Sequence, residues 1–196
     1  AAERAREAGF DGVEVHGAHG YLINAFLSPL SNRRTDAWGG DAAGRSRILG
    51  EIVTGVRAVI GSERALTVRV SGTDWAPGGN SPADVAEILR HAHPNLVDAV
   101  HVSSGGAVPA DIPVGRGYQL PAAKHIRTAL GRPVIAGGLV SDPGEALAAV
   151  RDEGNEFVFL GRALLRDPYW PLRAAEELGA EVPGPDQYRR ATPYGR

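Results

Sequence analysis

Two histidines and one tyrosine stand close together in the segment His16-Gly-Ala-His-Gly-Tyr21, which follows a short apolar run. The imidazole N–H groups of His16 and His19 could hold one carbonyl oxygen and stabilise negative charge that develops on it. The phenol of Tyr21 is protonated at neutral pH, because its ordinary pKa is about 10, and so could deliver a proton. Two other interpretations fit the histidines in isolation. They could bind a metal, for which no third ligand can be placed, or be core rings with satisfied hydrogen bonds.

Arg69 is a cation in the middle of an apolar run. Because an arginine is always charged, directing it into a protein interior requires an anionic or strongly polar partner. Leaving a buried charge without one costs about 3–5 kcal/mol. The partner could be a bound anion, or an internal carboxylate such as that of Glu14 or Asp74.

Glycines follow two successive apolar runs near the C-terminus, in the dipeptides Gly137-Gly138 and Gly161-Arg162. Glycine after a strand is ordinary turn chemistry. At two neighbouring strand ends, however, such residues could cradle a phosphate. Backbone N–H groups approach closely where no Cβ intervenes, and Arg162 would add charge-assisted hydrogen bonds.

The elements that must position these residues alternate along the chain. Strands are predicted near 13–15, 66–70, 99–102, 134–136 and 157–160, and helices near 42–60, 82–92, 120–130, 143–152 and 170–178. Such alternation predicts an α/β fold with a parallel sheet and helices packed against it. No Pro/Ser-rich linker interrupts the pattern, so residues 1–196 are interpreted as part of a single domain.

The strands have one apolar and one polar side. Positions 66, 68 and 70 are apolar, whereas 67, 69 and 71 are polar, and the first and third strands alternate in the same way. A TIM (β/α)8 barrel with polar groups inside fits this pattern better than a doubly wound sheet, whose strands are apolar on both faces. In such barrels the functional groups sit at the C-terminal ends of the strands, where the residues singled out above are found.

Only part of a barrel is expected. A complete barrel has eight strands and about 250 residues, whereas five strands are predicted here. The chain contains no methionine, and its first residues read as the middle of a helix. We therefore expect a C-terminal portion of a barrel from which about three N-terminal units are missing.

The composition excludes several function classes. The chain has 196 residues, is 43% hydrophobic and carries a net charge of −2, which gives no bias toward nucleic acid. No apolar run approaches the roughly 18 residues that a membrane span requires. The absence of cysteine excludes disulfides, thiolate metal sites and a thiol nucleophile.

The segment Leu22-Ile-Asn-Ala-Phe-Leu-Ser-Pro-Leu-Ser-Asn-Arg-Arg-Thr-Asp36, with Gly39-Gly40 after it, resembles the signature segment of the Old Yellow Enzyme family of FMN-dependent ene-reductases. The stretch Leu160-Gly-Arg-Ala-Leu-Leu-Arg-Asp-Pro-Tyr-Trp-Pro171 is similar to the family's closing stretch. The resemblance extends over essentially the whole chain, but only over the later part of the family's barrel.

The resemblance implies a cytoplasmic oxidoreductase with FMN as cofactor and NADPH or NADH as hydride donor. Flavin would pass the hydride to the activated C=C bond of an enone, or to a quinone. His16 and His19 would bind the substrate oxygen and Tyr21 would protonate the substrate. Arg69 would lie beside the N1/C2-carbonyl edge of the flavin, where it would favour the anionic reduced form.

Further implications concern the phosphate and the oligomer. The resemblance assigns the FMN phosphate to Gly137, Gly138, Gly161 and Arg162. An arginine near the C-terminus, Arg190 or else Arg189, would reach into the site of a neighbouring subunit, which implies a homo-oligomer. The segments 103–106 and 117–119 are similar to family segments on the flavin side of the barrel, without an assigned contact.

The chain departs from the family pattern at two places. It has Ala43-Gly-Arg45 where Glu-Asn-Arg is common, and Arg116 replaces the proline of a Gly-Pro-Gly-Tyr motif, which could alter substrate choice. Two alternatives stay open at this stage. One is a non-redox phosphate-binding barrel, which needs a catalytic carboxylate or a Schiff-base lysine at a strand end, although Lys124 falls in a predicted helix. The other is an inactive truncated half-barrel with exposed sheet edges.

Overall fold

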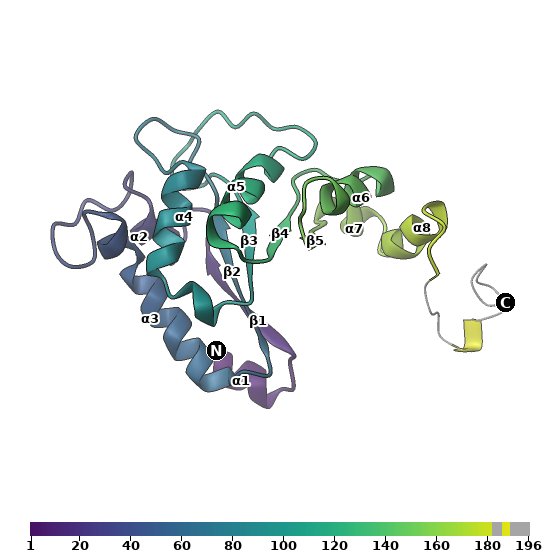
Figure 1. Cartoon of the computed structure of the whole chain (residues 1–196), viewed down its shortest axis with the longest axis horizontal. Helices are drawn as coiled ribbons and strands as arrows, with labels where there is room; N and C mark the ends of the chain where they lie inside the picture. Colours follow the sequence, from purple (N-terminus) through teal and green to yellow (C-terminus); the bar gives the residue numbers. More distant parts are fainter. Residues whose placement is uncertain (182–185, 189–196) are drawn as a thin grey trace.

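Five parallel strands, paired in the order in which they occur in the sequence, form the central sheet (Figure 1). The computed structural model describes residues 1–181 and 186–188. The strands are β1 (Gly12–Gly17), β2 (Ala65–Ser71), β3 (Ala99–Ser103), β4 (Val134–Ala136) and β5 (Phe157–Val158). Because each connection carries the chain back along helices, the carboxyl ends of all five strands lie at one edge of the sheet.

Helices α3 (Ala42–Ile60), α4 (Pro82–His91) and α5 (Leu120–Leu130) lie side by side against one face of the sheet (Figure 1). The apolar positions of the strands pack against them, and Val68, Val70 and Val102 are at most 1% exposed. Helices α6 (Pro143–Arg151), α7 (Arg162–Arg166) and α8 (Trp170–Glu177) form the C-terminal part, in which α6 contacts both β5 and α8. The remaining helices are α1 (Ala2–Glu7), α2 (Leu22–Leu27) and the 3-10 turns η1 (Pro94–Leu96) and η2 (Asp186–Tyr188).

The opposite face of the sheet is polar, as the alternation predicts. In register across the first three strands lie His16, Arg69 and His101. One layer below, Glu14 accepts a hydrogen bond from Thr67 at 3.0 Å and lies 3.0 Å from His101 Nδ1. The polar side chains therefore form a connected layer on the side of the sheet that the helices leave uncovered.

Local signals explain the helix boundaries. The α3 helix begins after Asp41, whose side chain accepts a hydrogen bond from the Gly44 N–H, and α5 ends at Gly131 in the left-handed conformation. A capping box of Ser81 and Asp84 starts α4. These signals lie in the sequence, and the predicted ranges 42–60 and 120–130 match the observed helices.

The structure differs from the prediction mainly at the carboxyl end. The predicted strand 157–160 is shorter, because only Phe157 and Val158 pair with β4 before the chain turns at Gly161 into α7. The α2 and α7 helices were not predicted, since six and five residues are too few to display a helical period.

Candidate active site

The three aromatic side chains at the end of β1 lie together. The ring centroids of His16 and His19 are 5.2 Å apart, and those of His16 and Tyr21 are 5.3 Å apart. His16 comes from the strand itself, whereas His19 lies in the loop after it and Tyr21 caps the start of α2. Two potential hydrogen-bond donors and a phenol therefore face a common space next to the polar layer of the sheet.

The loop after β1 is held in an unusual conformation. His19 has a φ of 61°, a left-handed value that is uncommon outside glycine. Its backbone N–H donates to Ser71 Oγ at 3.0 Å, and the Ser71 hydroxyl donates to the Gly105 carbonyl at 2.7 Å. A Cβ on Gly106 would lie 2.5 Å from His19 Cα, so the loops after β1 and β3 are in direct backbone contact.

The imidazole of His19 is neutral at physiological pH. Burial lowers the pKa of His19 from 6.5 to about 4, and the positive charges of Arg69, His16 and His101 act in the same direction. A neutral imidazole has one N–H donor and one acceptor nitrogen. His19 can thus donate to a substrate oxygen from one nitrogen only.

Protonation of His19 is expected to make stability depend on pH. Between pH 6.5 and about 4 the unfolded chain binds a proton at this ring that the folded chain does not, so stability falls as the pH is lowered through this window. The urea midpoint, measured across the window, should show a smaller pH slope in His19→Gln than in the unchanged protein. His91→Gln, which alters an exposed ring at the end of α4, should leave the slope as it is. Identical slopes in all three proteins would contradict the lowered pKa.

Arg69 forms no ion pair with any residue that the structure describes. Its Nε is buried without a hydrogen-bond partner, and its guanidinium carbon lies 5.6 Å from the centre of the Phe159 ring. Both carboxylates that sequence analysis offered as partners are engaged elsewhere. Glu14 contacts Thr67 and His101, while Asp74 accepts hydrogen bonds from the Ser28 hydroxyl and the Asn80 N–H. The guanidinium is therefore available for a bound anion.

A cavity of about 390 Å³ connects Arg69 to the glycine-containing ends of β4 and β5. Its size lies in the range of small-molecule sites. The residues that line it include Arg69, Ser103, Arg116, Tyr118, Gln119, Gly138, Phe159, Gly161, Arg162 and Arg166. Of the predicted phosphate-binding residues, Gly138, Gly161 and Arg162 line this cavity, and Gly137 lies next to it in the chain.

Crowding explains why positions 137 and 138 are glycines. A Cβ on Gly137 would lie 2.7 Å from the Phe159 carbonyl oxygen, and one on Gly138 would lie 2.9 Å from the Tyr118 ring. Gly138 also has a φ of 98°. Gly161, in contrast, has open space around its Cβ position, which leaves the backbone there accessible to a ligand.

The charge of the cavity fits an anionic cofactor. Arg116 pairs with Glu145, but Arg162 and Arg166, like Arg69, have no carboxylate partner within the described part of the chain. Three unpaired guanidinium groups thus face one cavity. A phosphate at one end and an electron-rich ring edge at the other would neutralise them, and FMN carries both. The residues present therefore fit FMN.

Several lining residues were not assigned a contact from the sequence. The Gln119 side-chain nitrogen donates toward the hydroxyls of Ser103, Ser104 and Tyr118, at 3.2, 3.2 and 3.0 Å. Similarity to family segments indicated their side of the barrel, but the individual contacts depend on how distant segments come together. Arg190 and Arg189 lie outside the described residues.

Other features lie away from this cavity. Lys124 is on the outside of α5, paired with Glu153, so it is not at a strand end as a Schiff-base lysine would need to be. No cluster of three metal-binding side chains occurs in residues 1–181 and 186–188, and no helix there is long and apolar enough to cross a membrane.

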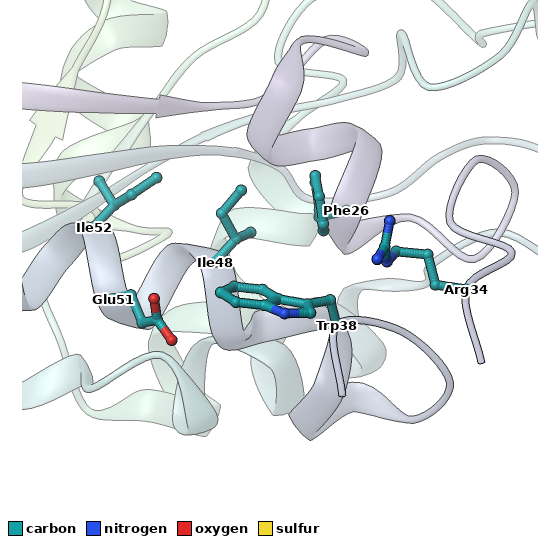
Figure 2. Close-up of a pocket in the computed structure, with 6 residues that line it drawn as sticks. All are labelled: Phe26, Arg34, Trp38, Ile48, Glu51 and Ile52. Carbon is teal, nitrogen blue, oxygen red and sulfur yellow. The ribbon is translucent and has the colours of Figure 1, made fainter. Parts of the chain in front are cut away.

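A second pocket lies on the helix side of the sheet, between α2 and α3 (Figure 2). Arg34 pairs with Asp36, and Arg47 stacks over Trp38 and pairs with Glu51. Because the charged side chains near this second pocket are already paired, the pocket lacks the unpaired cations of the cavity beside Arg69. It is lined by Phe26, Arg34, Trp38, Ile48, Glu51 and Ile52.

Comparison with known proteins identifies the family of the chain. The profile of the NADH:flavin oxidoreductase / NADH oxidase family matches residues 1–181. The chain belongs to this family. It is 47% identical over 189 residues to an NADPH dehydrogenase of Geobacillus thermodenitrificans, a match that covers 96% of the chain and 55% of the relative. An NADPH dehydrogenase of Halalkalibacterium halodurans is 45% identical over 188 residues, with the same coverage. The chain spans about half the length of these relatives.

Two solved structures of reductases are similar to the chain as well. Morphinone reductase matches with a TM-score of 0.73 and 30% identity, over 94% of this chain and 48% of that one. A 2-naphthoyl-CoA reductase complex matches with a TM-score of 0.81 and 30% identity, over 90% and 28%. These matches confirm the predicted family and the predicted partial TIM barrel. The matched family is described as one of NADH:flavin oxidoreductases, and the two bacterial relatives are NADPH dehydrogenases, which is the class that the resemblance implied.

Proposed function

We propose that the protein is an FMN-dependent oxidoreductase that transfers hydride from NADPH or NADH, through the flavin, to the activated C=C bond of an α,β-unsaturated carbonyl compound. One observation carries this proposal: a single cavity joins the unpaired Arg69 to Gly138, Gly161 and Arg162. Its wall includes Ser103, which contacts His19. Cofactor and substrate groups would therefore be adjacent.

The cofactor end of the site consists of cations and open backbone. Arg162 and the N–H groups of Gly137, Gly138 and Gly161 would hold the phosphate. Arg69 would neutralise negative charge on the ring system. When bound, FMN supplies the centre that accepts and returns the hydride.

The substrate end consists of donors. His16 and His19 would each donate one N–H to the carbonyl oxygen and stabilise the charge that develops on it as the alkene carbon accepts hydride. Tyr21, 65% exposed and 5.3 Å from His16 between ring centroids, would then protonate the neighbouring carbon.

Separating the two half-reactions tests this assignment. Anaerobic NADPH should bleach the FMN-loaded protein, and 2-cyclohexenone should restore the colour. Tyr21→Phe should slow recovery by about 10²- to 10⁴-fold, the usual contribution of a positioned acid, and leave bleaching unchanged. Tyr169→Phe, at another exposed tyrosine, should change neither step.

Three outcomes would refute the proposal. Failure to retain any FMN would remove the cofactor from the mechanism. Recovery with the enone at the same rate in Tyr21→Phe would remove Tyr21 as the acid, and recovery with quinones but with no enone would exclude the alkene substrate class.

The wider assembly is also a proposal. The single sheet of the described residues supports residues 1–196 as part of one FMN-binding domain. Resemblance to the family supports a cytoplasmic homo-oligomer in which Arg190 reaches a neighbouring site. Sedimentation velocity of the unchanged protein would test for the oligomer.

A further inference from the structure

Which of the two ring nitrogens of His19 carries the proton decides whether this residue can donate a hydrogen bond to a substrate. The ring is neutral at physiological pH and therefore carries a proton on only one of its two nitrogens. If that nitrogen donates to the protein, the other is an acceptor and cannot hold a carbonyl oxygen. The hydrogen bonds around His19 therefore determine its chemistry.

Two buried side chains, Ser103 and Gln119, form a hydrogen-bonded relay that contacts one of the two ring nitrogens. His19 Nε2 lies 2.6 Å from Ser103 Oγ, and Gln119 Nε2 lies 3.2 Å from the same oxygen. Both Ser103 and Gln119 are 3% exposed. The Gln119 amide nitrogen can only donate, so Ser103 Oγ is the acceptor in that contact. Among the described residues His19 Nε2 is then the one acceptor in hydrogen-bond contact with Ser103 Oγ, and it receives the hydroxyl proton. In this arrangement His19 Nε2 is the acceptor and Nδ1 carries the proton.

The other nitrogen is free. Nδ1 of His19 has no hydrogen-bond partner within the described part of the chain, and it is not among the buried unpartnered atoms. The only donor nitrogen of the neutral ring is thus the one that the protein leaves unused.

We propose that Ser103 and Gln119 are positioning residues that fix His19 as its Nδ1–H tautomer and so reserve its one donor for the substrate oxygen. The part of this proposal in which His19 donates to a substrate oxygen rests on the proposed function. The tautomer itself does not, because it can be observed without substrate.

The relay is anchored independently of the ring. Gln119 is the N-cap residue directly before α5, and it also reaches the hydroxyls of Ser104 and Tyr118. The backbone of His19 is fixed separately by Ser71. A ring held at both its backbone and Nε2 has little freedom to turn over and exchange its nitrogens.

Imidazole nitrogen NMR of the full chain, labelled with ¹⁵N-histidine, tests the proposal. Long-range ¹H–¹⁵N spectra distinguish a protonated from an unprotonated ring nitrogen, and the signals missing in His19→Gln assign the ring. We expect protonated Nδ1 and unprotonated Nε2 at pH 7. Ser103→Ala should convert this pattern to a mixture of tautomers, and Ser103→Thr, which keeps the hydroxyl, should restore it.

Ser104→Ala is the matched control. It removes a neighbouring buried hydroxyl that contacts the same Gln119 but not His19, and it should leave the His19 signals unchanged. Protonated Nε2 in the unchanged protein would overturn the proposal. So would a Ser103→Ala spectrum identical to that of the unchanged protein.

Kinetics separate this inference from the proposed function. With FMN saturating, Ser103→Ala should lower kcat/KM for enone reduction by about tenfold, the usual effect of one lost hydrogen bond. If the tautomer changes but enone reduction does not, the relay is correct and the assigned role of His19 is wrong. If the tautomer does not change, the relay is wrong whatever the rates.

Discussion

Arg69→Gln should weaken FMN binding about tenfold to about a hundredfold, because a hydrogen bond that involves a charged group contributes about 1.5–3 kcal/mol. The expectation follows from the unpaired state of this guanidinium, whose Nε is buried without a partner although two carboxylates lie on nearby elements. The quenching of flavin fluorescence on titration with the protein measures the effect. Arg151→Gln, at an exposed arginine of α6, should bind FMN as the unchanged protein does.

The cofactor-free protein gives a second readout for the same variant. If Arg69 serves the cofactor, its removal relieves a charge without a partner, and the thermal midpoint without FMN should stay the same or rise. A lowered midpoint combined with unchanged FMN affinity would mean that the arginine stabilises the fold instead.

Gly106→Ala should reduce enone reduction by about a hundredfold, because misplacing a reacting group by about 1 Å is known to cost that much. The added Cβ would lie 2.5 Å from His19 Cα and 2.8 Å from its carbonyl carbon, and Gly106 has a φ of 93°. These are backbone atoms, so no side-chain rotation can relieve the contact. The loop that carries His19 must move. Strain of this kind should also lower the free energy of unfolding by about 1–3 kcal/mol.

Gly115→Ala is the control, since this glycine lies in the same connection between β3 and α5 and has open space around it. Enone reduction and urea midpoints should both be measured. A lower midpoint with an unchanged rate would show that the loops accommodate the methyl group without moving His19.

Much of the fold could be predicted because its signals are local. The alternation of Leu66, Val68 and Val70 with polar neighbours defined the two faces of β2, and capping residues fixed the ends of α3 and α5. The short elements escaped prediction because α2 and α7 have at most six residues. The end of β5 depends on pairing with β4, which is a tertiary property.

The site was predictable only to the level of single residues. The positions of His16, Arg69, Gly137-Gly138 and Gly161-Arg162 on or after predicted strands indicated them as site residues. Functional groups gather at the carboxyl ends of the strands in a parallel barrel. Their partners were not predictable. The contact of His19 with Ser103 joins residues 84 positions apart. The sequence suggested Glu14 as a partner for Arg69, whereas the structure places Glu14 against His101.

The two ends of the cavity belong to parts of the sheet that differ in the extent of their strand pairing. Arg69 lies on β2, which pairs along its length with β1 and β3. Arg162, in contrast, is the first residue of α7 and comes shortly after β5, a strand of two residues. Leu165 and Tyr169 in that region are 85% and 71% exposed. Local opening free energies follow such differences in buried contact. A ligand that spans the cavity would therefore meet a rigid binding surface at the β2 end. At the β5 end the ligand itself would stabilise the fold, so its binding should slow amide hydrogen exchange there.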